Sequence, residues 1–132
     1  MGNRKKKYTP KSFESSKGSG DVSANIYNSM FESRSWNSLT KVQMILYLYM
    51  KRQYYGARGV EESIVHGKPP TEAFYFNKGM WKERYGLYTN QKSFYKDRDV
   101  LIEKGFIEIF ENGQSTKTKN IYVFSDKWRN DS

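Results

Sequence analysis

The chain contains no cysteine and a single histidine, His66, among its 132 residues. Without cysteine it forms no disulfide, and it has no thiolate for a metal site of the histidine and cysteine type. The absence of cysteine also fits a reducing compartment, and we expect the protein to be cytoplasmic.

Long apolar runs are missing too. The longest, from Met44 to Met50, is much shorter than the ~18 residues that a membrane helix needs. The N-terminus has no apolar stretch of the signal-peptide type, because polar residues follow Lys5, Lys6 and Lys7. We therefore expect no membrane partner.

Motifs that indicate catalysis are also lacking. The chain has neither a glycine-rich phosphate loop nor a serine elbow, and His66 lies in a segment rich in glycine and proline. Two neighbouring pairs of acids, Glu61 with Glu62 and Asp97 with Asp99, are expected by chance among 14 acidic residues. The sequence therefore predicts no enzyme and no cofactor.

Acidic residues are outnumbered by basic ones, which gives a net charge of +9 and favours a nucleic-acid partner. Residues 1–20 carry five of these nine charges, so the rest of the chain is only moderately basic. We expect residues 1–22 to be a disordered basic tail and residues 23–132 to be the folded domain. The candidate DNA contacts of this tail are Lys5, Lys6 and Lys7, which we expect either to bind phosphates along the DNA backbone or to enter a minor groove. The alternative is a tail that only aids solubility.

Aromatic residues make up 17% of the chain, enough to build a compact core. Apolar spacing predicts a short helix over 26–36. A stronger helix over 40–55 begins with Thr40 as N-cap and Gln43 as its capping-box partner. Its apolar stripe, which includes Val42 and Ile45, predicts that this helix is mostly buried.

The second half of the chain alternates helical and strand-like segments. A loop is expected over 56–70, a strand over 73–76, and a helix over 78–85 that Asn77 caps and Gly86 ends. A further helix, capped by Thr89 or Asn90, is expected to run over 90–104. Strands over 106–110 and 121–124 follow, joined by a turn and a polar loop over 112–120. This order predicts an α+β winged helix-turn-helix with three core helices, a short N-terminal helix and a C-terminal β-hairpin wing.

The helix over 90–104 is expected to present two different faces. Phe94, Arg98 and Leu101 fall on the buried side at 3.6 residues per turn. The outer face is basic near its start and acidic near its end, and it holds Lys92, Lys96, Asp99 and Glu103. The helix N-terminus also favours an anion, so we expect the first half to approach a DNA major groove.

The candidate DNA-binding residues of this helix are Asn90, Gln91, Lys92, Ser93, Tyr95 and Lys96. An asparagine or glutamine among them can make paired contacts to adenine. Asp99 is expected either to reject wrong bases or to pair with a neighbouring lysine.

The hairpin loop supplies candidate phosphate contacts from Thr116, Lys117, Thr118 and Lys119. Whether the helix or the wing is the main reader stays open. A rival interpretation is a stacking platform for single-stranded nucleic acid, which requires the strand aromatics to be exposed on one sheet face. These aromatics are Phe74, Tyr75, Phe76, Phe106, Phe110, Tyr122 and Phe124.

Two stretches carry a family resemblance. The first combines Ser29-Met30-Phe31, Ser33, Trp36 and Leu39-Thr40 with the run from Ile45 to Leu48. The second runs from Ser93 to Asp97 and on to the segment from Leu101 to Ile107. Over roughly residues 26–125 the chain resembles winged-helix DNA-binding proteins of plasmids, conjugative elements and phages of Gram-positive bacteria.

The resemblance implies an accessory protein of a mobile genetic element that binds double-stranded DNA at an origin of transfer or replication, or at an operator. Because the chain ends soon after the wing, we expect this role rather than that of a full replication initiator. A relaxase or another replication or transfer protein, and a second copy of the chain on DNA, are the implied protein partners. The alternative is a winged helix that binds proteins through its aromatic surface and basic tail, without direct DNA binding.

Overall fold

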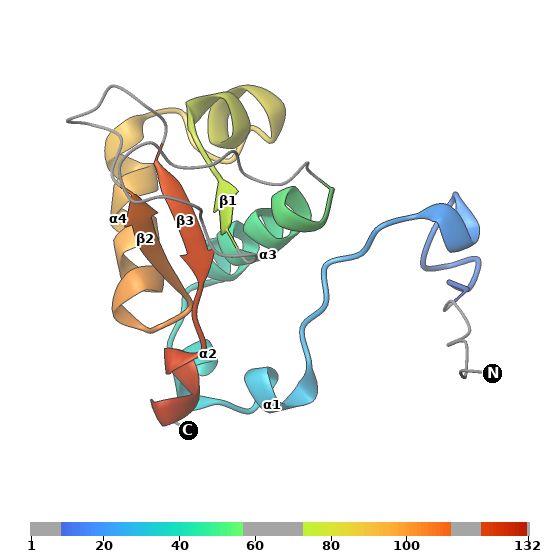
Figure 1. Ribbon diagram of the computed structural model, residues 1–132, viewed down its shortest axis with the longest axis horizontal. Helices are drawn as coiled ribbons and strands as arrows, with labels where there is room; N and C mark the ends of the chain where they lie inside the picture. Colours follow the sequence, from blue (N-terminus) through green and yellow to red (C-terminus); the bar gives the residue numbers. More distant parts are fainter. Residues whose placement is uncertain (1–8, 57–72, 112–119, 132) are drawn as a thin grey trace.

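The computed structural model describes residues 9–56, 73–111 and 120–131, which form a mixed α+β fold (Figure 1). Its helical segments are η1 (Gly18–Gly20), α1 (Asn28–Phe31), α2 (Arg34–Asn37), α3 (Lys41–Gly56), η2 (Gly79–Arg84), α4 (Gln91–Glu103) and η3 (Lys127–Asp131). Its strands are β1 (Ala73–Tyr75), β2 (Ile107–Glu111) and β3 (Ile121–Phe124). None of the described helices is long and apolar enough to cross a membrane.

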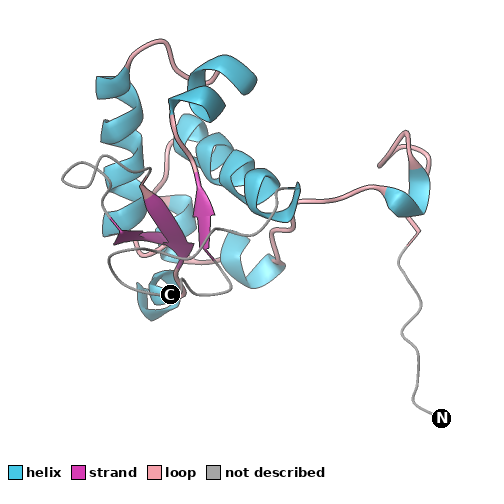
Figure 2. Ribbon diagram, turned by 45° about the horizontal axis from the view of Figure 1, so that its top comes forward, coloured by secondary structure: helices cyan, strands magenta, loops and turns pink. Residues whose placement is uncertain are grey.

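The three strands form an antiparallel sheet in the order β1-β3-β2. Phe74 lies opposite Tyr122, and Ile107 lies opposite Phe124, so their side chains share one face of the sheet. Helices α3 and α4 cover this face, because α3 packs against β1 and α4 against β2. Figure 2 shows α3, α4 and the sheet packed into one body, from which the N-terminal segment reaches away.

The segment before α3 differs from the single helix predicted over 26–36. It forms two separate turns, α1 and α2, with Ser33 between them. The Ser33 hydroxyl donates to the Met30 carbonyl at 2.7 Å and accepts from the Trp36 amide at 3.1 Å. The prediction of one helix was wrong because this serine ends the first turn and caps the second.

The capping box predicted for α3 is confirmed. The Gln43 backbone N–H donates to the Thr40 hydroxyl at 3.2 Å. The Thr40 backbone N–H donates to Gln43 Oε1 at 2.9 Å. These two bonds satisfy backbone donors that the start of a helix otherwise leaves without partners.

The buried face of α3 is rotated away from the predicted stripe. Leu46, Tyr47 and Met50 are buried, whereas Val42 and Ile45 are 52% and 44% exposed. The expectation that these two residues face the core was wrong. The periodicity missed the rotation because two glutamines, which it counts as polar, lie on the buried face and find polar partners there.

The helix predicted over 78–85 is present as the π-helix η2, but the predicted capping by Asn77 was wrong, because Lys78 is the N-cap and no side chain caps this helix. The Tyr85 amide donates to the Met80 carbonyl five residues earlier, at 2.9 Å. Gly86 follows with a φ of +62°, as expected of a residue that ends a helix. This geometry stacks Trp81 on Phe94 of α4, with ring centroids 5.1 Å apart.

Candidate nucleic-acid interface

Asn90 is the N-cap of α4, which is one of the two residues predicted for this position. Asn90 Oδ1 accepts the backbone N–H of Ser93 at 2.9 Å. The carbonyl oxygen of this side chain therefore serves the helix, and Asn90 has its amide N–H groups left for an outside partner.

The two faces predicted for α4 are confirmed. Phe94 and Leu101 are buried in the core, and the Arg98 side chain is only 14% exposed. On the opposite side Lys92, Lys96, Asp99 and Glu103 are all exposed. The outer face therefore has the predicted order of charges, with its cations in the first half of the helix.

Asp97 ties α4 to the rest of the core. Tyr88 donates its hydroxyl to Asp97 Oδ2 at 2.8 Å, and Gln43 Nε2 donates to Oδ1 at 3.1 Å. Burial, together with the hydrogen bond to Asp97, raises the pKa of Tyr88 well above its ordinary value. Gln43 also caps α3, so one side chain joins the start of α3 to the middle of α4.

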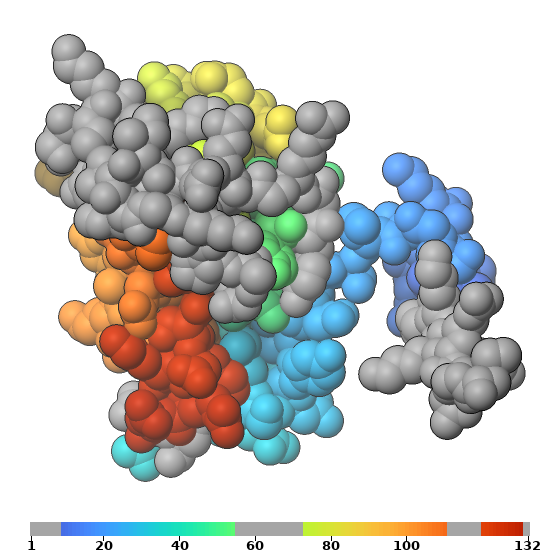
Figure 3. Space-filling view, in the orientation of Figure 1, coloured from blue at the N-terminus to red at the C-terminus, as the bar shows by residue number. Residues whose placement is uncertain are grey.

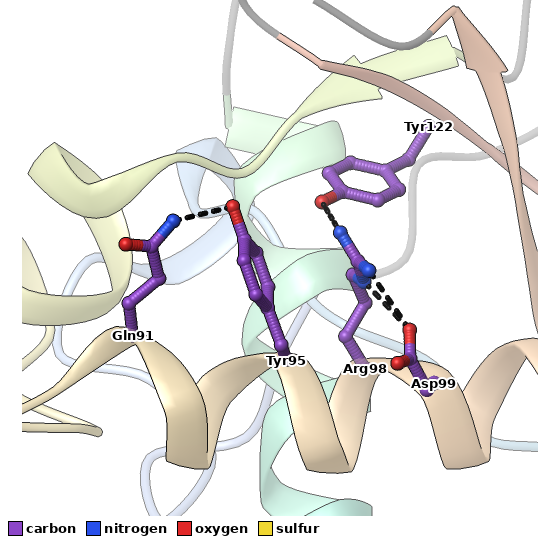
Figure 4. Close-up of polar contacts among 5 residues, drawn as sticks. All are labelled: Gln91, Tyr95, Arg98, Asp99 and Tyr122. Carbon is purple, nitrogen blue, oxygen red and sulfur yellow. Dashed lines mark hydrogen bonds and ion pairs between the residues drawn. The ribbon is translucent and has the colours of Figure 1, made fainter. Parts of the chain in front are cut away.

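Asp99 pairs with its neighbour Arg98, not with a lysine. Arg98 Nη2 lies 2.9 Å from Asp99 Oδ1, and the Asp99 side chain is 62% exposed. Figure 4 shows the Arg98 guanidinium between Asp99 and the hydroxyl of Tyr122, to which it donates at 3.4 Å. The same guanidinium lies 4.3 Å from the ring centroid of Tyr95. Burial opposes the charge of Arg98, but these hydrogen bonds outweigh it and raise its pKa.

Tyr95 and Gln91 face the sheet side of α4. Gln91 donates its side-chain amide to the Tyr95 hydroxyl, one helical turn further on (Figure 4). Both side chains border a hollow of about 150 Å³ between the start of η2, the first half of α4 and the start of β3. Lys78 and Asn120 also line this hollow.

The outer face of α4 is thus left with unneutralised positive charge. Lys92 and Lys96 form no ion pair within the described residues. Asp97 is engaged by two donors of the core, and Asp99 is engaged by Arg98. The remaining acid, Glu103, lies at the far end of the helix, so the first half of α4 attracts anions.

Lys78 is a candidate that the sequence reasoning missed. It is exposed at the start of η2 and lines the same hollow as Gln91 and Tyr95. Lys82, four residues further on, is exposed as well. This spacing of two lysines was visible in the sequence, but only the packing of η2 against α4 shows that Lys78 lies beside the predicted site.

The predicted tail and wing residues lie outside the described part of the chain. They are Lys5, Lys6, Lys7, Thr116, Lys117, Thr118 and Lys119, and the turn residues Asn112 and Gly113 lie outside it too. Asn120, the first described residue after that gap, lines the hollow beside α4. The described end of the hairpin therefore meets the first half of α4.

The rival stacking platform for single-stranded nucleic acid is contradicted by the burial of the strand aromatics. Phe74, Phe76, Phe106 and Tyr122 are each at most 2% exposed. Tyr75, Phe110 and Phe124 are half-buried, and Phe124 stacks on Phe74 with ring centroids 4.5 Å apart. These rings pack within the protein and do not form an open platform.

Two further observations bear on the site. No group of three or more potential metal ligands occurs among residues 9–56, 73–111 and 120–131. Comparisons of the chain with protein-family models, with curated proteins and with solved structures found no match. The interpretation of the site therefore depends on its residues and their geometry.

Proposed function

We propose that this chain is a winged helix-turn-helix protein that binds double-stranded DNA, with α4 as the recognition helix and the β2–β3 hairpin as the wing. The order of elements supports this assignment, because α3, β1, η2, α4, β2 and β3 follow one another along the chain. The sheet order β1-β3-β2 also supports it, since the hairpin then lies beside the strand that precedes η2.

The observation that carries the proposal is the charge on the outer face of α4. Lys92 and Lys96 are exposed one turn apart near its start, while Asp97 and Asp99 are held by protein donors. An α-helix with its side chains is about 10–12 Å wide, which matches a major groove about 12 Å wide. The first half of α4 enters the groove, where Lys92, Lys96 and Ser93 meet phosphates and base edges.

The biological role that we propose is that of an accessory protein of a mobile genetic element. The protein marks an origin of transfer or replication, or an operator, and has no catalytic activity of its own. This part of the proposal rests on the resemblance of the segments around Ser93 and Leu101 to plasmid and phage winged helices.

The proposal is tested by measuring the affinity of the full chain for a random-sequence DNA duplex at several salt concentrations. For about five phosphate contacts, log affinity falls against log salt with a slope of about −4 to −5. Absence of binding at low salt would refute DNA binding as the function.

The role of α4 is tested with the double variant K92A/K96A. At roughly 1 kcal/mol for each lost contact, affinity falls about 30-fold, and the salt slope becomes shallower by about 1.8. The matched control K104A/R129A removes the same charge near the opposite end of α4 and leaves the affinity much less changed. Equal affinity of K92A/K96A and the unmodified chain would move the site to Lys117 and Lys119 of the wing.

A further inference from the structure

The exposed apolar side chains are confined to one part of the molecule. In the described part of the chain, the large hydrophobic residues that are exposed all lie between positions 13 and 45. They are Phe13, Val22, Tyr27, Phe31, Val42 and Ile45. The described residues of η2, α4 and the sheet have none, so this apolar surface is separate from the proposed DNA-binding face.

Two of these residues, Phe13 and Val22, belong to an N-terminal arm, defined here as residues 9–24, and Tyr27 lies just after it. The arm stands away from the body of its own chain (Figure 3). It has a local fold, because the Ser15 hydroxyl donates to Asp21 at 2.6 Å and accepts from the amides of Lys17 and Gly18. Phe13 is nevertheless 83% exposed, so an aromatic ring on a hydrogen-bonded turn has no packing against the described body of the chain.

The base of the arm is fixed to the body. Lys51 of α3 donates to the carbonyl of Asn25 at 2.8 Å, and Ile26 packs against the core. The arm therefore leaves the body at a defined point. The chain between Asp21 and Ile26 can span up to about 17 Å when extended, so the folded turn that carries Phe13 is held away from the body and can contact a neighbouring molecule.

The other three exposed apolar residues, Phe31, Val42 and Ile45, define what we call the α1–α3 face. Phe31 is 48% exposed, and the two α3 residues are exposed to a similar extent. The charges beside the α3 part of this face are positive, since Lys41 and Arg52 are exposed and α3 contains no acidic residue, whereas the acid Glu32 follows Phe31.

The arm has the complementary pattern. Its two exposed apolar residues each have an acid next to them in the sequence, Glu14 beside Phe13 and Asp21 beside Val22. The arm also carries Lys11 and Lys17, so the match is local: Phe13 with Glu14 and Val22 with Asp21 suit the apolar residues of α3 beside Lys41 and Arg52.

We propose that the chain forms a two-fold symmetric dimer in which the arm of each protomer packs on the α1–α3 face of its partner. Each chain carries both halves of the contact once, so a two-fold axis satisfies both in a closed assembly. One buried phenylalanine removes roughly 150–250 Å² from water, whereas a stable interface buries about 1,200 Å² or more. Twelve apolar side chains, six from each protomer, supply enough area for such an interface.

The dimer leaves α4 uncovered in both protomers. Two such helices on one assembly suit a DNA site made of two half-sites. The dimer can be tested without DNA, so its failure and the failure of the proposed function are distinguishable.

The first test is the mass of the full chain in solution, measured by sedimentation over a range of micromolar concentrations. The unmodified chain is a dimer, and I45E weakens the dimer at least tenfold because it places a carboxylate in the interface. V42E is the second variant, and circular dichroism checks that both variants are folded. The control S93E adds the same charge on α4 and leaves the dimer intact. A monomer at every concentration, or a dimer that I45E and V42E leave unchanged, would overturn the proposal.

The second test uses the absence of cysteine, which makes introduced thiols unique. The single variants F13C and I45C are mixed and treated with a short bismaleimide. A covalent dimer that contains one chain of each variant supports the exchange of arms. A cross-link within one monomeric chain of the double variant F13C/I45C would overturn it, since the arm would then pack on its own body.

Discussion

Replacing Asp97 with alanine is expected to destabilise the protein strongly, although Asp97 lies on the helix that we propose enters DNA. Its carboxylate accepts one hydrogen bond from Tyr88 and one from Gln43, at 2.8 and 3.1 Å. Both donors are nearly buried, with Tyr88 9% and Gln43 6% exposed. Alanine removes both bonds and leaves two buried donors without an acceptor.

The magnitude follows from these two bonds. A hydrogen bond to a charged group contributes about 1.5–3 kcal/mol, and a buried donor without a partner costs about 1–3 kcal/mol. Asp97 itself is half-buried, so water can replace part of the loss, and we take the lower end for each bond. The free energy of unfolding should fall by about 3 kcal/mol, which lowers the melting temperature by about 10–15 °C for a domain of this size.

The assay is thermal and urea unfolding followed by circular dichroism, with D99A as the matched control. D99A removes the same charge two residues away, but its ion pair with Arg98 involves a side chain that is 62% exposed. An exposed ion pair of this kind contributes about 0–1 kcal/mol. If D97A and D99A unfold within about 2 °C of each other, the reasoning about Asp97 is refuted.

The variant Y88F sharpens the test. In the unmodified protein this change should lower the free energy of unfolding by about 1 kcal/mol, because Asp97 loses one donor. In the D97A background the same change should be neutral or stabilising, because it removes a hydroxyl that has lost its acceptor. Additive effects of the two substitutions would show that Tyr88 and Asp97 do not act as a pair.

Two further predictions concern the stability of the C-terminal half. Gly105 has a φ of +86°, and a Cβ there would lie 2.6 Å from the Trp128 amide nitrogen, so G105A should cost about 3 kcal/mol or more. Gly86 has a φ of +62° but open space around an added Cβ, so G86A should lower the free energy of unfolding by only about 1–2 kcal/mol. Urea unfolding of the two variants measures this difference. The hydrogen bond from Lys127, opposed by partial burial, lowers the pKa of Glu108. The ionised Glu108 therefore contributes its full stabilisation of the fold above pH 4.5, its ordinary pKa, and this stabilisation is lost as the pH falls through the lowered pKa. Melting temperatures across this acidic range should depend less on pH in E108Q than in the unmodified chain, and identical profiles would contradict the assigned pair.

Local signals predicted much of the fold. Helix ends lie where the sequence marks them at Thr40 with Gln43, at Asn90 and at Gly86. Each of these signals depends on bonds between residues a few positions apart, which a sequence displays directly. The predicted disorder of residues 1–22 concerns the dynamics of the tail and stays a prediction.

Other features required contacts that the sequence does not display. Ser33 divides the predicted N-terminal helix because its hydroxyl bonds both to the turn before it and to the turn after it. Val42 and Ile45 turn outward because Gln43 and Gln53 find partners on other elements, 54 and 32 residues away. A hydrophobic pattern treats both glutamines as surface residues, so it extends the predicted buried face of α3 to Val42 and Ile45, although Leu46 of the same stripe is buried.

The candidate site divides in the same way. The sequence by itself determined that Lys92 and Lys96 share the outer face of α4, because helical periodicity and one buried ring, Phe94, suffice to orient a helix. Only the tertiary structure decided which charges remain on that face. Asp97 is engaged by Gln43 and Tyr88 across the core, and Lys78 joins the site because η2 packs beside α4. Periodicity is a property of neighbouring residues, whereas the direction in which a charged side chain is held depends on which partners the fold brings within hydrogen-bond distance of it.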